Sequence, residues 1–321
     1  MSLFALVYGR WKFMATEAKR NKVGWYFLIP ITALLAVFLL YPILYSIYLT
    51  FTSKRGLLVN FVGFANYTKL FKDPMFIKAL GNTLKILLIQ VPIMLILALI
   101  FAALLNSKHI KYKGFFRTCL FLPSVTSLIA YIILFKMLFD YNGMINDVLL
   151  ALGLIKNRIP WGQSSGPATF VLIIAMIWRW TGYNMIFYLS AMQNISGNLY
   201  EAAEIDGCSP TKSFFLITLP LLKPMILFTT VMSTIGTLQL FDEPMNLSAG
   251  GTTAALMGPD NCYLTLSVYI YNLCFHSVPK FGYAATVSYA ILIIVAVLTF
   301  LQFRFTEGEE KKLERKARRI K

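Results

Sequence analysis

The sequence predicts an all-α polytopic membrane protein with six transmembrane helices and both termini in the cytoplasm. Of the 321 residues, 58% are hydrophobic and only 14% are charged, whereas a soluble domain is about half apolar and about a quarter charged. The mean hydropathy of +0.66 points the same way. Six apolar stretches are each long enough, at about 20 residues, to cross a bilayer as a helix. Backbone groups in lipid must pair within their own segment, and the alternating pattern of a membrane barrel is absent, so helices are expected.

The six spans follow one another along most of the chain. They are expected at about 25–50, 84–106, 117–139, 168–193, 223–244 and 281–304, within one transmembrane domain of residues 25–304. A cytoplasmic segment, 1–24, precedes this domain, and a charged cytoplasmic tail, 305–321, follows it. The apolar run from Val23 is too long for a cleavable signal peptide. In the first outer loop, helical spacing after Pro74 predicts a short interfacial helix, and in the outer loop 140–167 Trp161 is a candidate interface anchor.

The orientation of the spans follows from the distribution of Lys and Arg. With the N-terminus inside, nineteen of these residues fall in inner segments and eight in outer loops, the bias typical of cytoplasmic termini. The other three lie within spans. Lys85 and Lys136 are near outer ends, where they are expected to reach the headgroups, and Arg179 is about 16 Å deep. The net charge of +16 is therefore explained by topology, and no basic face with interleaved aromatics predicts nucleic-acid binding.

A polar segment of the chain, residues 194–222, lies on the cytoplasmic side between the fourth and fifth spans. Its acids and Asn198 suit a helix start, Gly207 permits a sharp turn, and Pro220 ends a second short helix. The segment contains E-A-A-x3-G-x9-I-x-L-P, formed by Glu201, Ala202, Ala203, Gly207, Ile217, Leu219 and Pro220.

The residues that would supply energy or catalysis are missing from the sequence. It contains neither a G-x-x-x-x-G-K-[ST] phosphate loop nor an H-E-x-x-H pair, and its four cysteines have no metal-ligand spacing. Cys262 and Cys274 share an outer segment, where they are either free or paired. The histidines, His109 and His276, fall on opposite sides of the membrane, so no clustered catalytic set is expected. If the protein moves a solute uphill, another chain is expected to supply the energy.

The cytoplasmic motif resembles the coupling motif of permease subunits of binding-protein-dependent ABC importers, with all its fixed positions present. Further stretches resemble the sugar-permease branch, of the maltose-transporter first-permease type: VGFANYTKLFKDPMFIKALGNTLK, RTCLFLPSVTSLIAYIILFKMLF, WRWTGYNMIFYLSAMQNI and LQLFDEPMNLSAGG. The resemblance implies that two short helices joined at Gly207 seat in a groove of a separate ATPase subunit. It implies that Ala202 and Ala203 allow close approach and that Glu201 offers an acceptor.

One helical stripe of the fourth span suggests a path for a polar solute. Sugars stack on aromatic rings and hydrogen-bond to amides and charged groups, so we expect Trp180, Tyr183 and Asn184 to suit a sugar. Arg179 is a candidate for the same cavity because a buried charge in a span is by default functional, the alternatives being snorkelling or an ion pair with Asp242. Gln239 and Asp242 complete the predicted contacts.

The resemblance implies a permease for a carbohydrate in the cell membrane of a bacterium or archaeon. The expected partners are a second permease, two ATPase subunits and an extracytoplasmic solute-binding protein. No cofactor or metal is expected on this chain, since ATP and magnesium would bind the ATPase, and the chain itself would not be an enzyme. A secondary transporter or channel acting alone is the rival interpretation. The absence of acids deep within the spans argues against it.

Overall fold

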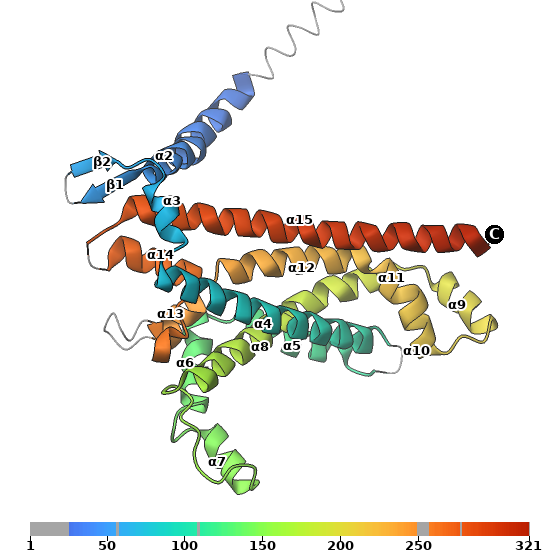
Figure 1. The fold of residues 1–321 in the computed structure, drawn as a ribbon. Coiled ribbons are helices and arrows are strands. Elements are labelled where there is room, and N and C mark those ends of the chain that lie inside the picture. Colours follow the sequence, from blue (N-terminus) through green and yellow to red (C-terminus); the bar gives the residue numbers. More distant parts are fainter. Residues whose placement is uncertain (1–25, 56–57, 108–109, 249–256, 277, 321) are drawn as a thin grey trace, which may run out of the picture.

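The computed structural model describes residues 26–320 apart from 56–57, 108–109, 249–256 and 277. Helices form most of this part of the chain, as the sequence predicts, and its only strands form one two-stranded hairpin (Figure 1). The elements are η1 Ala36–Leu40, α2 Tyr41–Thr50, β1 Thr52–Arg55, β2 Leu58–Phe61, α3 Ala65–Leu70, α4 Pro74–Asn106, α5 Lys113–Val125, α6 Leu128–Leu138, α7 Met144–Ala151, α8 Ser165–Gln193, α9 Gly197–Ile205, α10 Pro210–Ser213, η2 Phe214–Thr218, α11 Leu219–Leu221, α12 Lys223–Leu238, α13 Asp242–Ser248, η4 Pro259–Asn261, α14 Leu266–Phe275 and α15 Phe281–Ile320.

In the described chain, four helices are long and apolar enough to span a membrane, and the number rises to six when each of two bent helix pairs counts as one span. The four helices are Tyr26–Thr50, Pro74–Asn106, Ser165–Gln193 and Phe281–Thr306. The pair Lys113–Val125 and Leu128–Leu138 is bent by 98°, and the pair Pro210–Leu221 and Lys223–Leu238 by 64°. The first of the six projects away from the other helices in Figure 1, and its apolar window is 0% buried.

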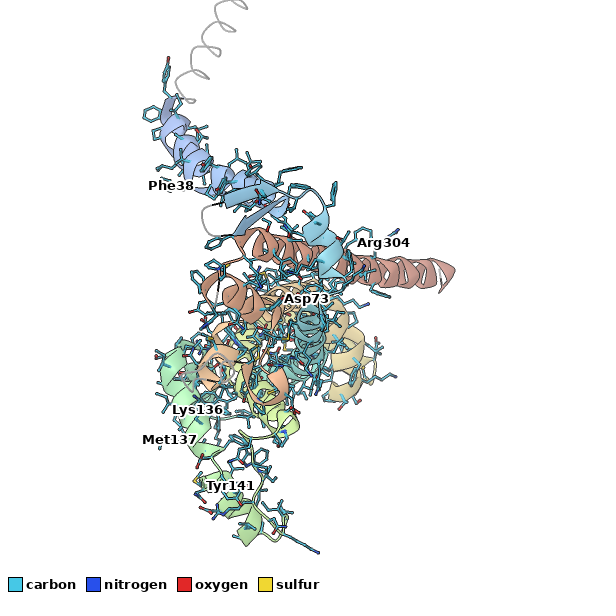
Figure 2. The ribbon with its side chains drawn as sticks, turned by 60° about the vertical axis from the view of Figure 1, so that its left-hand side comes forward. Phe38, Asp73, Lys136, Met137, Tyr141 and Arg304 are labelled. Carbon is cyan, nitrogen blue, oxygen red and sulfur yellow. The ribbon has the colours of Figure 1, made fainter. Side chains whose placement is uncertain are left out.

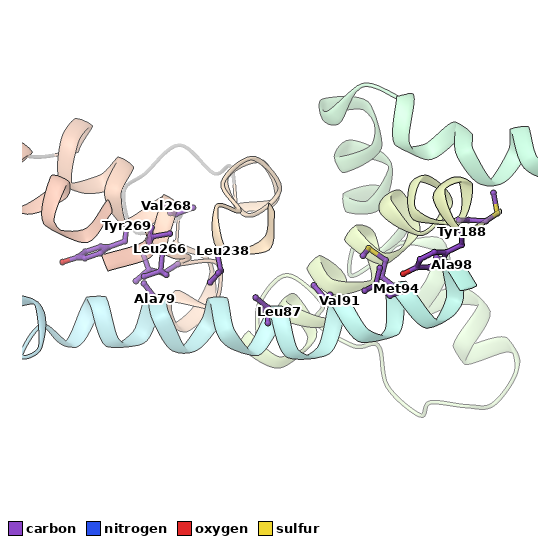
Figure 3. Close-up of a cluster of buried hydrophobic side chains, with 14 of the residues drawn as sticks. Ala79, Leu87, Val91, Met94, Ala98, Tyr188, Leu238, Leu266, Val268 and Tyr269 are labelled. Atoms are coloured by element: carbon purple, nitrogen blue, oxygen red, sulfur yellow. The ribbon is translucent and has the colours of Figure 1, made fainter. Parts of the chain in front are cut away.

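The buried core forms where α4, α8, α12 and α14 pack together. Figure 3 shows α4 contributing Ala79, Leu87, Val91, Met94 and Ala98 to one cluster. Tyr188 comes from α8, and its hydroxyl shares a 2.6 Å hydrogen bond with that of Thr229 on α12. These contacts fix α8 and α12 against the long α4.

The first outer loop corrects one expectation. Instead of a separate interfacial helix after Pro74, the helix α4 runs unbroken from Pro74 to Asn106. Asp73 caps its start, since Oδ1 accepts a 3.0 Å hydrogen bond from the backbone N–H of Met75. Proline is favoured in a first turn because the N–H that it lacks would have no partner there. The cap and the proline thus start the helix ten residues before the predicted span.

Two predicted spans are interrupted. The span expected at 117–139 bends at Thr126, whose hydroxyl donates to the carbonyl of Pro123 at 2.7 Å. The span expected at 223–244 ends at Leu238, and three non-helical residues separate it from α13. Apolar composition alone does not mark either break.

The C-terminal helix and the loop 140–167 add further detail. The last candidate span, Phe281–Thr306, agrees with the predicted 281–304, and the backbone of α15 remains helical beyond it to Ile320. Trp161 is 8% exposed, and its Nε1 donates to Oδ1 of the fully buried Asn146 at 3.1 Å. The expectation that Trp161 anchors the chain at the membrane interface is therefore wrong, because the ring packs inside the outer loop.

Candidate functional site

The cytoplasmic motif forms two short helical segments around a tight turn. Glu201, Ala202 and Ala203 lie on α9, and Gly207 follows its end with φ of +71°. The N–H of Gly207 donates to the carbonyl of Glu204 at 3.0 Å, and that of Cys208 to Ala203 at 2.8 Å. This is the hydrogen-bond pattern of a Schellman C-cap, whose left-handed residue is usually glycine. Gly207 is thus required by the backbone of the turn.

The second segment of the motif is α10, η2 and α11, which leads into α12. Ser209 caps α10, Ile217 lies in η2, and Leu219 and Pro220 lie in α11. The hydroxyls of Tyr200 and Thr218 share a 2.8 Å hydrogen bond that ties α9 to η2. The two segments therefore form one body with a fixed angle at Gly207.

The outward surface of this body is both apolar and acidic. Ile205 is 87% exposed, and Phe215 and Leu216 are exposed as well. Glu201 and Glu204 are exposed on α9. Apolar side chains on a polar, solvent-facing segment are typical of a surface that another protein covers.

The second feature is a cavity of about 580 Å³ that is lined by α4, α6, α8, α12, α13 and the stretch between α12 and α13. All six residues predicted for the substrate path line it: Arg179, Trp180, Tyr183, Asn184, Gln239 and Asp242. Whether they contact a substrate stays a prediction. Four of these residues come from consecutive turns of α8, so a single helical stripe in the sequence was enough to predict their common position.

An aromatic ladder forms one wall of the cavity. The rings of Trp180 and Tyr183 are 5.7 Å apart, those of Tyr183 and Phe187 5.1 Å, and those of Phe187 and Phe228 5.8 Å. Each pair has a T-shaped arrangement, which is favoured between aromatic rings. The ladder continues from α8 onto α12, so these two helices share the apolar wall.

The guanidinium of Arg179 lies beside this wall. It is 4.5 Å from the ring centroid of Tyr131 and 5.5 Å from that of Trp180, so both contacts are cation–π interactions. Its Nε and Nη1 are buried and have no hydrogen-bond partner among the described residues. Within the same part of the chain, the one ion pair joins Arg158 to Asp147, so Arg179 does not pair with Asp242. These two N–H groups of Arg179 are therefore available to donate hydrogen bonds to a ligand, or to a protein group in another conformation of the cavity.

Two polar residues of the cavity were missed by sequence reasoning. Glu243 is 6% exposed and lines the cavity, and Tyr131 interacts electrostatically with both Glu243 and Arg179. Gln90 is buried in α4, where its Oε1 accepts a 3.1 Å hydrogen bond from Thr237 on α12. Gln90 could have been found from the sequence, because it is a single amide in the middle of the apolar run that forms α4. No comparable indication in the sequence pointed to Glu243, because this residue is buried only as a result of the helix break after Leu238.

Comparison with known proteins identifies the family. The model of the binding-protein-dependent transport system inner membrane component matches residues 86–313. The chain belongs to this family. A permease of this family is a multi-pass inner-membrane component of a transport system rather than an enzyme. The predicted family and membrane location are thereby confirmed.

Two relatives and one solved structure extend this result. The chain is 53% identical over 280 residues to the lactose transport system permease protein of Rhizobium radiobacter, covering 87% of this chain and 92% of that protein. It is 33% identical to an arabinooligosaccharides transport system permease protein of Halalkalibacterium halodurans, covering 84% and 83%. A bacterial ABC transporter that imports the acidic polysaccharide alginate has the same fold, with a TM-score of 0.78, 22% identity and coverage of 92% and 98%.

Proposed function

We propose that this chain is a permease subunit of an ABC importer for a carbohydrate. It works with a second permease, two ATPase subunits and an extracytoplasmic solute-binding protein. The family membership supports the binding-protein-dependent system. The relatives named for lactose and arabinooligosaccharides support a sugar as the substrate.

The observation that carries this proposal is that the cavity and the cytoplasmic motif are built on the same two helices. α8 carries Arg179 and Trp180 to the cavity and ends at Gln193, directly before α9. α12 begins directly after α11 and lines the cavity with Thr229, Ser233 and Thr237. A force applied to the motif therefore acts on both walls of the cavity.

The work comes from a separate ATPase that binds ATP and magnesium, and this chain holds no cofactor. Closure of two ATPase subunits moves the segment from α9 to α11 as one body and switches the cavity between its inward and outward openings. The cavity suits a neutral ring with hydroxyl groups, because aromatic rings cover apolar ring faces while amides and a guanidinium donate hydrogen bonds.

Reconstitution in lipid vesicles tests the proposal. The chain is co-expressed with a second permease, an ATPase and a solute-binding protein from the same organism, and uptake of labelled lactose, an arabinooligosaccharide and an amino acid is compared. We expect uptake of one sugar that requires ATP, all subunits and the binding protein. Uptake by this chain alone, driven by an ion gradient, would contradict the proposal and support the secondary transporter.

A further inference from the structure

Three polar side chains at the cavity wall lack the bonds that buried groups normally form. Glu243 is 6% exposed, and it forms no ion pair within the described part of the chain. The hydroxyl of Tyr131 and the Nε and Nη1 of Arg179 are buried there without hydrogen-bond partners. Buried polar groups in proteins are nearly always paired. A group that this chain does not itself supply is therefore needed to complete the arrangement.

Tyr131 brings the two charged residues to the same wall. The guanidinium of Arg179 lies 4.5 Å from the centroid of its ring, and the carboxylate of Glu243 interacts with its hydroxyl. The helix break before α13 makes this possible, because α13 packs against α6, the helix on which Figure 2 labels Lys136 and Met137. Lys136 forms no ion pair with Glu243. A donor on α8 and an acceptor on α13 thus line one cavity.

Much of the other polar lining is already engaged within the protein. Gln90 accepts a 3.1 Å hydrogen bond from Thr237, and its Nε2 donates to the sulfur of Met94 at 3.1 Å. The Nδ2 of Asn184 donates to the carbonyl of Trp180 at 3.0 Å. These bonds hold α4, α8 and α12 in place, so the charged pair on α8 and α13 is better placed to bind a solute.

A second permease does not explain the unpaired groups. Glu243 and the two nitrogens of Arg179 are buried within this chain alone. Another chain that covers the cavity would therefore meet the outside of this wall. Because both residues line the cavity, a solute inside it is the group that reaches them.

We propose that Arg179 and Glu243 recognise adjacent hydroxyl groups of a sugar ring, with the guanidinium as donor and the carboxylate as acceptor. Each hydroxyl both donates and accepts hydrogen bonds, so two adjacent hydroxyls satisfy both residues at once. This inference rests on the proposed function, which supplies the sugar. It adds Glu243 as a residue that determines specificity.

The charges of the cavity favour an uncharged sugar over a uronic acid. Asp242 and Glu243 line it, and Arg179 is the single base among its described lining residues. The guanidinium already lies against two aromatic rings. The carboxylate of a uronic acid would be a third acid in this cavity, and like charges in a partly buried site repel each other. A pair of hydroxyl groups brings no net charge and avoids this cost.

The test uses the reconstituted system and measures ATP-dependent sugar uptake together with ATP hydrolysis. Glu243→Gln removes the charge of the acceptor at nearly constant size. Arg179→Gln independently removes the charge of the donor, so either variant decides the test if the other assembles poorly. Asp140→Asn is the matched control, because Asp140 is an exposed acid of an outer loop that does not line the cavity. The yield of complex and the stimulation of ATP hydrolysis by the loaded binding protein show that each variant folds and couples.

We expect each cavity variant to take up the sugar on the order of tenfold more slowly than the wild type, with unchanged stimulation of ATP hydrolysis. More ATP is then consumed per sugar, whereas the control keeps the wild-type ratio.

Analogues of the sugar that each lack one hydroxyl identify the contact, when each is supplied at a concentration that saturates the binding protein. One of them should be taken up about tenfold more slowly than the parent sugar by the wild type, and at the rate of the parent by Glu243→Gln. The corresponding uronic acid should be rejected by the wild type and less strongly by Glu243→Gln.

Three outcomes are decisive against the inference or its basis. Wild-type uptake by both cavity variants, or unchanged discrimination among the analogues, would overturn the recognition of hydroxyl groups. Loss of complex or of ATPase stimulation in both variants would overturn it in favour of a structural role for the two residues. Failure of the wild-type system to take up any sugar would instead contradict the proposed function.

Discussion

Gly207 offers a perturbation whose cost is set by the backbone alone. Its φ of +71° is in the left-handed region, and a Cβ added there would meet no atom within 4 Å. A substitution therefore introduces no clash, and its effect comes from the conformational penalty. Left-handed backbone costs about 1–2 kcal/mol for an ordinary residue, less for asparagine and more for a β-branched residue.

The expected effects follow from this order. A penalty of 1–2 kcal/mol lowers the population of the native turn by at most about 5- to 30-fold, and binding to the ATPase weakens by the same factor. We expect Gly207→Asn to be mild, Gly207→Ala intermediate, and Gly207→Val to abolish uptake while the protein still inserts into the membrane. The helices on either side keep their own hydrogen bonds, so the loss should concern coupling rather than folding.

The assay compares three quantities in each variant: the amount of chain in the membrane, the fraction that retains the ATPase during purification, and ATP-dependent uptake. Gly197→Ala is the matched control, because Gly197 begins the short helix α9 that Gly207 follows, has open space around it and lacks a positive φ. Normal uptake by Gly207→Val, or equal damage from asparagine and valine, would refute the argument that the turn is the rigid joint of a lever.

Three further predictions concern stability. Gly182→Ala places a Cβ 1.7 Å from the carbonyl oxygen of Leu120, so we expect a loss of at least about 1–3 kcal/mol, seen as a lower unfolding temperature in detergent, whereas Gly166→Ala, with open space, should have little effect. Asn146→Leu removes the side-chain partner of three part-buried backbone groups of the outer loop, at up to about 1–3 kcal/mol each, and should make that loop sensitive to limited proteolysis; unchanged cleavage would contradict this. Burial tends to raise the pKa of Asp73, but hydrogen bonds from two tyrosine hydroxyls and the backbone outweigh it and hold the pKa below its ordinary value. Because the pKa of Asp73 is lower in the folded than in the unfolded chain, its carboxylate stabilises the fold at pH values above the unfolded pKa of about 4, and this stabilisation is lost as the pH falls through the folded-state pKa. Asp73→Asn should therefore be less stable than the wild type at pH 7. Its stability should fall less than that of the wild type when the solution is acidified.

The spans were predictable because their signal is local and strong. Twenty apolar residues in a row have few alternatives in a membrane, so Ser165–Gln193 and Pro74–Asn106 contain the ranges expected from the sequence. The turn at Gly207 was predictable for a similar reason, since a glycine at a helix end has a specific backbone role.

The helix breaks were not predictable from the same signal. Residues 126–127 and 239–241 are bordered by apolar sequence on both sides, and the residues at these positions are compatible with helix. The partner at the second break is tertiary, because the carbonyl of Leu240 accepts a hydrogen bond from the hydroxyl of Thr265 in a distant segment. A pattern read along the chain does not contain that partner.

The residues of the candidate cavity also fall into some that could be predicted from the sequence and some that could not. Residues of α8 share one helical face, so their common position could be predicted, and the structure places all of them around one cavity. Glu243 could not be predicted because a continuous helix would carry it toward the outer surface. The break turns α13 toward α6, where Glu243 interacts with Tyr131.

The arrangement of continuous and interrupted helices suggests where the cavity changes shape. α8 is unbroken from the cavity to the cytoplasmic motif, and the fourteen helical steps from Arg179 to Gln193 span about 21 Å at the helical rise. Such a helix transmits displacement with little bending. The opposite wall, from Gln239 to Glu243, is joined to α12 by non-helical backbone and held by the hydrogen bond from Thr265. Movement of α8 against this wall changes the separation of Arg179 from Glu243. Arg179, whose Nε and Nη1 are buried, and the buried Glu243 therefore lie on these two parts of the cavity and form no ion pair within the described residues.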